Sequence, residues 1–251
     1  MSADRQPDAM ESIPRGVFRT ADLPPGQRNR AWNEIAQPFF DHVVPLADRE
    51  MEGEIATQLL GGWLGSVVRF NSHSYARGRA HSPDAGRDYC FIQLYRSGTL
   101  QGDCDGRAVQ VRPGDILFID VGEPLTLRAT AGEIAILILP RAELGWPATR
   151  LHGHVLERES PATRELARCL EPLAPGLPAL TRAEARDFKT CVRPALVAAL
   201  EHTLGQPGEG PSARGVTMRS AESLDVGECS NDTAMREIHD TLRAWGEGVR
   251  R

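Results

Sequence analysis

The sequence lacks an excess of positive charge. Its 29 Lys and Arg residues face 34 Asp and Glu residues, the formal net charge is −5, and Lys189 is the only lysine. A protein whose main role is to coat nucleic acid usually carries a basic stripe and a high pI. The charge balance therefore argues against that class, while it leaves room for a small local basic face.

Long hydrophobic runs are missing too. The longest aliphatic runs, residues 134–139 and 195–200, fall far short of the ~20 residues that a membrane helix needs. The polar residues 1–16 contain no apolar stretch typical of a signal peptide. We therefore expect a cytoplasmic protein that has no membrane partner.

Cysteine is present in an odd number, and no CxxC pair occurs. This usage fits a reducing compartment rather than a disulfide framework. Cys104 lies at a predicted hairpin between two aspartates, so we expect it to be exposed and unreactive. Three others lie in apolar patterns that predict core positions: Cys90, Cys169 and Cys191.

Motifs of nucleophilic and nucleotide-dependent catalysis are absent. No GxSxG, HExxH, GxxxxGK[ST] or GxGxxG occurs. His152, His154 and Glu159 have the local spacing of a metal-binding cupin, but they follow the last predicted strand, and no later strand supplies a third histidine. We therefore predict no metal and no cofactor. A cupin-type metal-dependent enzyme, an isomerase or dioxygenase, stays as the alternative.

Short β-rich runs alternate with turn signals through the middle of the chain. Asp105-Gly106 is a strong signal for a two-residue hairpin turn, and Pro113-Gly114-Asp115 precedes an apolar run. Short strands separated by turns at regular intervals are typical of a jelly-roll barrel. The predicted strands are residues 55–60, 62–70, 89–95, 99–103, 107–111, 116–120, 125–130 and 133–139.

Helical patterns flank these strands. Trp32 and Ile35 predict a short helix that Pro38 interrupts. Ser160-Pro161 is a helix start. Thr181 and Glu184 form a capping box at the start of a longer helix that contains Pro194. A linker rich in Gly, Pro and Ser follows, and a last short helix is predicted near residues 232–245.

One predicted strand has the pattern of a pocket wall. Along residues 89–95 an aromatic face with polar tips, formed by Tyr89, Phe91, Gln93 and Tyr95, alternates with an aliphatic face. Small-ligand sites combine apolar bodies with a few directed polar groups, so we expect this face to line a pocket, with Trp63 and Phe118 beside it. The alternative is that these aromatics simply fill the barrel.

An ordered series of segments resembles the N-terminal half of AraC-type transcriptional regulators. The segments are VFRTAD (17–22), AWNE (31–34), DYCFIQL (88–94), GDCDGR (102–107), RPGDILFID (112–120), LPR (139–141), and LHG (151–153) through Ser160-Pro161. They span roughly residues 15–205. In that family a cupin-like barrel binds a small effector, the following helices mediate dimerisation, and a C-terminal domain with two helix-turn-helix units binds DNA.

The resemblance implies four parts: a flexible N-terminal arm (1–30), a cupin-like effector-binding barrel (31–140), a helical dimerisation segment (141–205), and a linker with a short terminal helix (206–251). It places Arg77 at a position where its side chain would pair with a carboxylate effector. It makes Phe188, Val192, Ala195 and Ala199 candidates for a dimer contact, with packing on the chain's own barrel as the alternative.

We therefore expect an α+β fold, a cupin-like jelly-roll β-barrel followed by helices. The predicted function is effector sensing and dimerisation, as in an AraC-type regulator, with a small organic molecule in a metal-free barrel. The expected partners are that effector and a second subunit, which makes a homodimer or a mixed dimer with a full-length relative. Residues 206–251 are too few for two helix-turn-helix units, so no direct DNA binding is expected from this chain.

Overall fold

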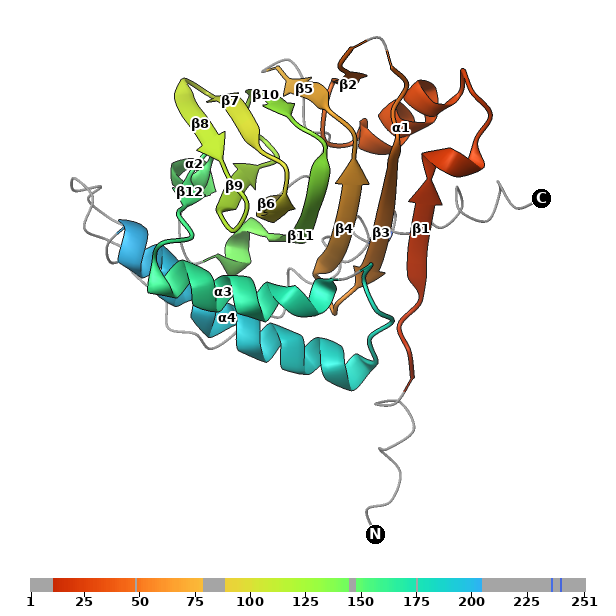
Figure 1. The fold of residues 1–251 in the computed structure, drawn as a ribbon. Coiled ribbons are helices and arrows are strands. Elements are labelled where there is room, and N and C mark those ends of the chain that lie inside the picture. The colour runs from red at the N-terminus through yellow and green to blue at the C-terminus, as the bar shows by residue number, and fades with distance from the viewer. Residues whose placement is uncertain are drawn as a thin grey trace.

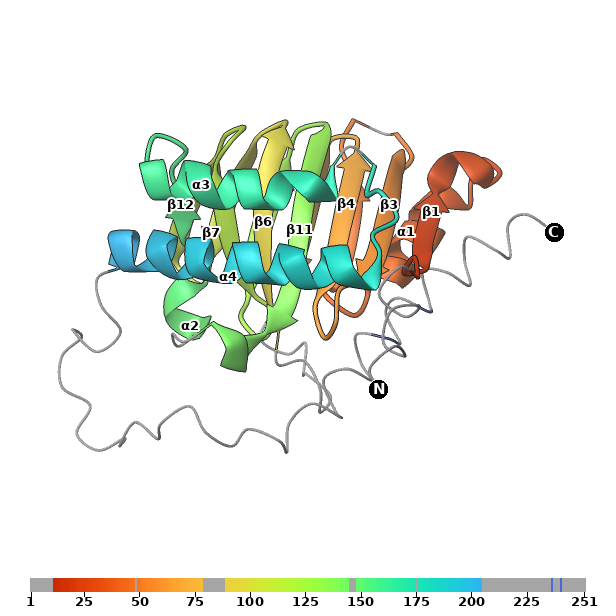
Figure 2. The ribbon, with the colours of Figure 1, turned by 90° about the horizontal axis from the view of Figure 1, so that it is seen from below.

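The computed structural model describes residues 11–47, 49–78, 89–144, 148–174 and 176–204, together with Arg236 and Asp240. Within these residues two antiparallel sheets face each other, and two helices cover the outer face of the larger sheet (Figure 1). Figure 2 shows these helices running side by side across the strands. The arrangement confirms the predicted α+β class, a cupin-like jelly roll followed by helices.

The strands divide between the sheets in a fixed order. The larger sheet runs β1 (Arg15–Arg19), β3 (Gly53–Leu59), β4 (Leu64–Phe70), β11 (Gly132–Pro140), β6 (Tyr89–Ser97), β9 (Ile116–Asp120) and β12 (Val155–Leu156). The smaller sheet runs β2 (His42–Pro45), β5 (His73–Arg77), β10 (Leu125–Ala129), β7 (Leu100–Cys104) and β8 (Arg107–Val111). The helices are α1 (Arg28–Ala36), α2 (Ala148–Leu151), α3 (Pro161–Leu170) and α4 (Arg182–Leu204).

Two cores lie on either side of the larger sheet. The inner core fills the space between the sheets and includes Phe91 and Tyr95 of β6. The outer core lies between the larger sheet and the helices α3 and α4, and it includes Ile92 and Leu94 of the same strand. Because successive side chains of a strand point to opposite faces, β6 supplies both cores alternately. Both of its faces are therefore buried.

Most of the predicted turns and helix ends occur where the sequence places them. Asp105 and Gly106 join β7 to β8 with φ of +48° and +86°, and Gly106 donates its N–H to Asp103. Thr181 and Glu184 exchange the two reciprocal hydrogen bonds of a capping box at the start of α4. Helix α1 ends at Ala36, before Pro38. Ser160 precedes α3, although its hydroxyl makes no capping bond.

All eight predicted strands are present, but others were missed. Strand β1 lies inside the segment predicted as a flexible arm, where it pairs with β3. Strands β2 and β5 occupy stretches without a recognised strand signal and pair with each other. The predicted linker and terminal helix lie outside the described residues, except for Arg236 and Asp240.

Two cysteine predictions are wrong. Cys104 is buried because its side chain belongs to the inner core at the end of β7, and Gly153 leaves room for it. Burial raises its pKa to about 12, so the expectation of an unreactive thiol agrees with the structure while its predicted exposure does not. Cys191 is exposed because it lies on the outer side of α4.

A buried polar cluster fastens the end of β9 to the segments around it. His152 accepts a hydrogen bond at Nδ1 from the backbone N–H of Asp120 (3.2 Å) and lies 2.9 Å from the Pro124 carbonyl through Nε2. Because the carbonyl can only accept, the imidazole is neutral with its proton on Nε2. Asp120 also pairs with Arg141. Within the described residues, no helix is long and apolar enough to cross a membrane.

The capping box gives a first stability test. Replacing Thr181 by Ala removes the hydroxyl that accepts the Glu184 N–H bond, and we expect the free energy of unfolding to fall by about 1 kcal/mol. Thr190→Ala is the matched control, since Thr190 lies within α4 and its hydroxyl donates to the Arg186 carbonyl of its own helix. Alanine favours a helix interior. Equal losses for the two variants in urea unfolding would contradict the capping role.

A second test concerns acid stability. Burial lowers the pKa of His152 and His73 in the folded protein. Below about pH 6.5 these histidines therefore bind protons in the unfolded chain but not in the folded chain. Because protonation favours the unfolded chain, the free energy of unfolding falls as the pH drops from 7 to 5. We expect His152→Gln, whose amide can replace both bonds, to show a shallower pH slope in urea unfolding. The exposed His202→Gln should keep the wild-type slope. An unchanged slope in the His152 variant would remove this residue from the explanation.

Candidate functional site

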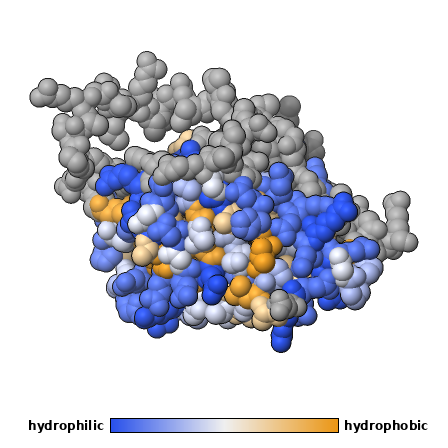
Figure 3. All heavy atoms as spheres, turned by 90° about the horizontal axis from the view of Figure 1, so that it is seen from above, coloured by the Kyte–Doolittle hydropathy of each residue, from blue (hydrophilic) through white to orange (hydrophobic). Residues whose placement is uncertain are grey.

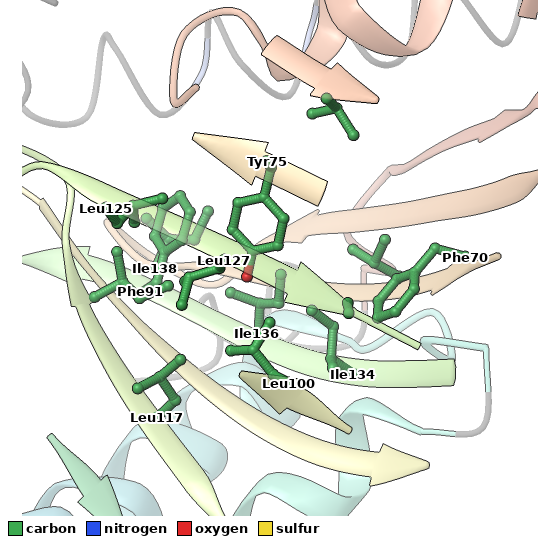
Figure 4. Close-up of a cluster of buried hydrophobic side chains, with 14 of the residues drawn as sticks. Phe70, Tyr75, Phe91, Leu100, Leu117, Leu125, Leu127, Ile134, Ile136 and Ile138 are labelled. Carbon is green, nitrogen blue, oxygen red and sulfur yellow. The ribbon is translucent and has the colours of Figure 1, made fainter. Parts of the chain in front are cut away.

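A cavity of about 120 Å³ lies in the inner core between the two sheets. Strands β3, β4, β6 and β11 form one wall, β5 and β10 contribute to the other, and α1 with the following Phe39 and Phe40 lies across one end. Figure 4 shows the adjoining apolar side chains, with Tyr75 reaching from the smaller sheet toward Ile136 of the larger one. Most of the lining is aliphatic or aromatic.

Two tyrosine hydroxyls meet across this space. Tyr75 comes from β5 and Tyr95 from β6, and their side chains are hydrogen-bonded to each other. Burial is the main cause that raises the pKa of both phenols well above the usual value. Both hydroxyls therefore stay protonated at neutral pH, and their hydrogen bond links the two sheets.

Gln93 presents an unused hydrogen-bond acceptor at the cavity. Its side chain is buried on β6, and its Oε1 atom has no hydrogen-bond partner in the described part of the chain. A buried acceptor left without a partner costs about 1–3 kcal/mol. Such an atom in the wall of a cavity is a natural point of attachment for a ligand that donates a hydrogen bond.

His73 adds a second polar group with a defined tautomer. Its Nδ1 atom lies 2.8 Å from the Asn71 carbonyl, so the ring proton is on Nδ1, and Nε2 is left as an acceptor. The ring packs edge-on against Phe70 and is stacked with Tyr75. Burial lowers its pKa, so the imidazole is neutral. Among the described residues lining the cavity, none carries a formal charge.

The structure divides the predicted ligand-binding residues into two groups. Phe91 and Gln93 line the cavity, as does Tyr95 of the same strand face. Tyr89 belongs to the inner core but does not line the cavity. Trp63 and Phe118 point to the opposite face of the larger sheet and belong to the outer core.

Trp63 is held by charged side chains beside the helices. Its indole N–H donates to Glu143 (2.6 Å), and the Lys189 ammonium lies 4.7 Å from the ring centroid. Arg193 of α4 also lies over the ring and pairs with Glu143. Trp63 therefore fixes α4 against the sheet and does not face the cavity.

Arg77 has a structural task rather than the predicted contact with a carboxylate effector. Its side chain is only 2% exposed, and its guanidinium donates to the backbone carbonyls of Phe39 (2.8 Å), Asp120 (2.6 Å) and Glu123. These bonds connect the segment after α1 to the end of β9. The group does not line the cavity.

The predicted dimerisation stripe lies inside the chain. Phe188, Val192, Ala195 and Ala199 are all buried in the outer core, against the larger sheet and α3. These four side chains therefore pack on the chain's own barrel, as the alternative interpretation has it. A contact with a second subunit would have to use other faces of the helices.

The histidines with cupin-like spacing serve the fold. Both ring nitrogens of His152 are engaged with backbone groups, as described above, and His154 lies beside Arg107. Throughout the described ranges, no group of three or more His, Cys, Asp or Glu side chains is placed to hold a metal ion.

Several cavity residues were missed from the sequence. His73 and Tyr75 lie outside every predicted strand, although His73, Tyr75 and Arg77 alternate with small residues in the period of a strand. Trp32 and Ile35 were correctly placed on a helix, but the sequence did not show that this helix covers the end of the barrel.

The described residues on the outer side of the smaller sheet form a different kind of surface. Figure 3 shows this face as largely polar, with small separate apolar patches. Single exposed apolar residues of this kind are normal for a folded protein. The buried cavity is therefore the candidate functional site.

Comparisons with known proteins agree with the architecture. The chain is similar in structure to the AraC-like transcriptional activator CuxR, with 26% identity and a TM-score of 0.65 over 74% of this chain and 70% of that one. More distant likenesses include KdgF from Halomonas sp. (13% identity, TM-score 0.27, 36% and 79% of the two chains) and an RmlC-like cupin from Shewanella frigidimarina (11%, 0.27, 40% and 83%). A comparison with curated protein sequences found no match.

A family model, the AraC-binding-like domain, matches residues 31–211, which is more than half of the chain. The match runs from α1, at one end of the cavity, past the end of α4, and so includes the cavity and both helices of the outer core. The chain is accordingly a member of the AraC-binding-like domain family.

Proposed function

We propose that this chain is the effector-sensing domain of an AraC-type transcription regulator and that it binds a small organic molecule in the inner cavity. The observation that carries the proposal is the unpaired Gln93 Oε1 atom in the wall of a buried apolar cavity. The family membership and the similarity to an AraC-like activator support the regulatory role.

The cavity limits the chemistry of the effector. Its volume of about 120 Å³ approaches that of an engineered protein cavity of about 150 Å³ that holds benzene. The proposed effector is therefore about the size of a single ring. The absence of charge among the described lining residues favours a neutral molecule, because an unpaired charge is costly to bury. Gln93 Oε1 and His73 Nε2 favour one that carries an N–H or O–H donor.

The same sheet offers a route from the cavity to the helices. Phe91, Gln93 and Tyr95 of β6 face the cavity, while Ile92 and Leu94 between them pack against the outer core. A ligand that displaces or orders this strand therefore acts on the surface that supports α3 and α4. A ligand can shift the equilibrium between two arrangements of the strand and the helices only by the difference between its affinities for them.

Dimerisation remains part of the proposal, with a changed contact surface. The apolar stripe of α4 is buried, but Val197 on the same helix is 41% exposed. We place the contact with a second copy, or with a full-length relative, on the outward faces of α3 and α4. Two-fold dimers are the commonest oligomers of soluble proteins.

A thermal-shift experiment tests the ligand site. Phenol should raise the unfolding midpoint more than benzene, which lacks the donor, and more than benzoate, which is charged. At a concentration of about 100 times its dissociation constant, a ligand adds ~2.7 kcal/mol to the free energy of unfolding. This corresponds to a rise of roughly 5–10 °C in the unfolding midpoint for a chain of this size. Gln93→Leu should remove the preference for phenol over benzene, while Gln110→Leu on the exposed face of β8 should keep it.

The outcomes separate clearly. If none of the three compounds changes the midpoint, the proposed single-ring class fails. If Gln93→Leu responds to phenol as the wild type does, the cavity binds without the amide. The variant itself should be at least as stable as the wild type, because it removes an unsatisfied buried acceptor.

Sedimentation velocity at micromolar concentration tests the dimer. We expect the wild-type chain to sediment as a dimer and Val197→Asp to sediment as a monomer, because the charge would be buried at the contact. Val44→Asp is the matched control: Val44 is similarly exposed (48%) but lies on β2, far from α4 in the fold. A monomeric wild type, or a dimer lost equally in both variants, would contradict the placement.

A further inference from the structure

Two cysteines meet where α3 packs against α4. The Sγ atoms of Cys169 and Cys191 lie 2.7 Å apart, and the Cys169 sulfur also lies 3.7 Å from the Cys191 carbonyl oxygen. A disulfide has a sulfur–sulfur distance of about 2.05 Å, so a movement of well under 1 Å would join them. Both are free thiols in this structure.

The two thiols differ in access. Cys191 is exposed on the outer side of α4, whereas Cys169 is buried on α3. A surface groove beside them is lined by Arg168 and Pro172, among others. An oxidant can therefore reach Cys191 from solvent, and Cys169 lies behind it in contact range.

We propose that Cys169 and Cys191 form an oxidation-sensitive modification site, which closes as an intrachain disulfide when a peroxide oxidises Cys191. Nothing in the proposed effector site uses either residue, since both lie on the opposite side of the larger sheet from the cavity. The inference therefore does not depend on the proposed effector.

The chemistry balances in two steps. The Cys191 thiolate attacks one peroxide oxygen and the O–O bond breaks, which gives a sulfenic acid and, after protonation of the leaving oxygen, water. The Cys169 sulfur then attacks the Cys191 sulfur, the S–S bond forms, and the hydroxyl leaves as a second water. Two thiols are oxidised and one hydrogen peroxide is reduced.

The order of the steps follows from the surroundings of the thiols. Burial raises the pKa of Cys169 to about 12, which makes it a poor first nucleophile toward peroxide. Its proximity compensates in the second step, because the reaction is then intramolecular. Among the other described cysteines, Cys90 lies under the sheet in the outer core and Cys104 lies in the inner core, so neither competes.

The consequence is a covalent link within the helical layer. Figure 2 shows α3 and α4 crossing the same strands side by side. A bond between them fixes their relative position and constrains the unfolded chain across residues 169–191, which raises stability. A reductant such as dithiothreitol reverses the reaction.

Peptide mapping after treatment with hydrogen peroxide tests the site in the full chain. Trypsin releases Cys169 in the peptide 169–182 and Cys191 in the peptide 190–214, because the bond between Arg193 and Pro194 resists cleavage. We expect these two peptides to appear linked, with a loss of two hydrogen atoms, and to separate on reduction. Links among other cysteines, or oxidised Cys191 without a link, would overturn the proposal.

Thermal unfolding gives an independent readout. Oxidation should raise the midpoint of the wild type by roughly 6–12 °C and should leave Cys191→Ser unchanged. Cys191 is exposed, so its replacement by serine should not disturb the fold. Cys104→Ala, which removes a cysteine but keeps the pair, should respond like the wild type. A shift of equal size in Cys191→Ser would show that oxidation acts elsewhere.

Discussion

The larger sheet must be covered on both faces, and most of the structure follows from this constraint. Its central strands carry apolar side chains on each side, so neither face can be left to water without a large loss of hydrophobic free energy. The smaller sheet covers one face and the helices α3 and α4 cover the other. The position of the cavity, the burial of the α4 stripe and the contact of Cys169 with Cys191 all depend on this three-layer arrangement.

The inner layer is not completely filled, and its polar groups are unevenly satisfied. The hydroxyls of Tyr75 and Tyr95 are hydrogen-bonded to each other, whereas Gln93 Oε1 lacks a partner among the described residues. A core selected only for stability would tend to replace Gln93 by an apolar residue, because the amide costs free energy when it is buried without a partner. A ligand that binds in the cavity accounts for Gln93 at this position better than packing does.

The sequence predicted much of the fold because strand alternation and turn chemistry are local signals. The Asp105-Gly106 turn and the Thr181 capping box each need only a few neighbouring residues, and both occur as predicted. The site was harder to predict because a change of one residue in register exchanges the faces of a strand. Trp63 and Phe118 have the composition of pocket residues, yet both face the helices.

Long-range contacts explain the remaining differences. Arg77 looked available for an anionic effector, but its three carbonyl partners come from segments that only the folded chain brings together. Strand β1 contains few apolar residues, and its place in the sheet depends on pairing with β3. In the same way the apolar stripe of α4 fits equally a dimer contact and an internal contact. Only the position of the sheet beneath it decides between them.

Strand β6 connects these observations physically. It contributes Gln93 to the cavity and Leu94 to the outer core, so the candidate ligand site and the helical layer share one element. Because close-packed interiors transmit small displacements rather than absorb them, a change at the cavity reaches the surface under α3 and α4. A disulfide between those helices would stiffen the same layer from its outer side. Effector binding and oxidation would then act on one set of contacts from opposite faces of the sheet.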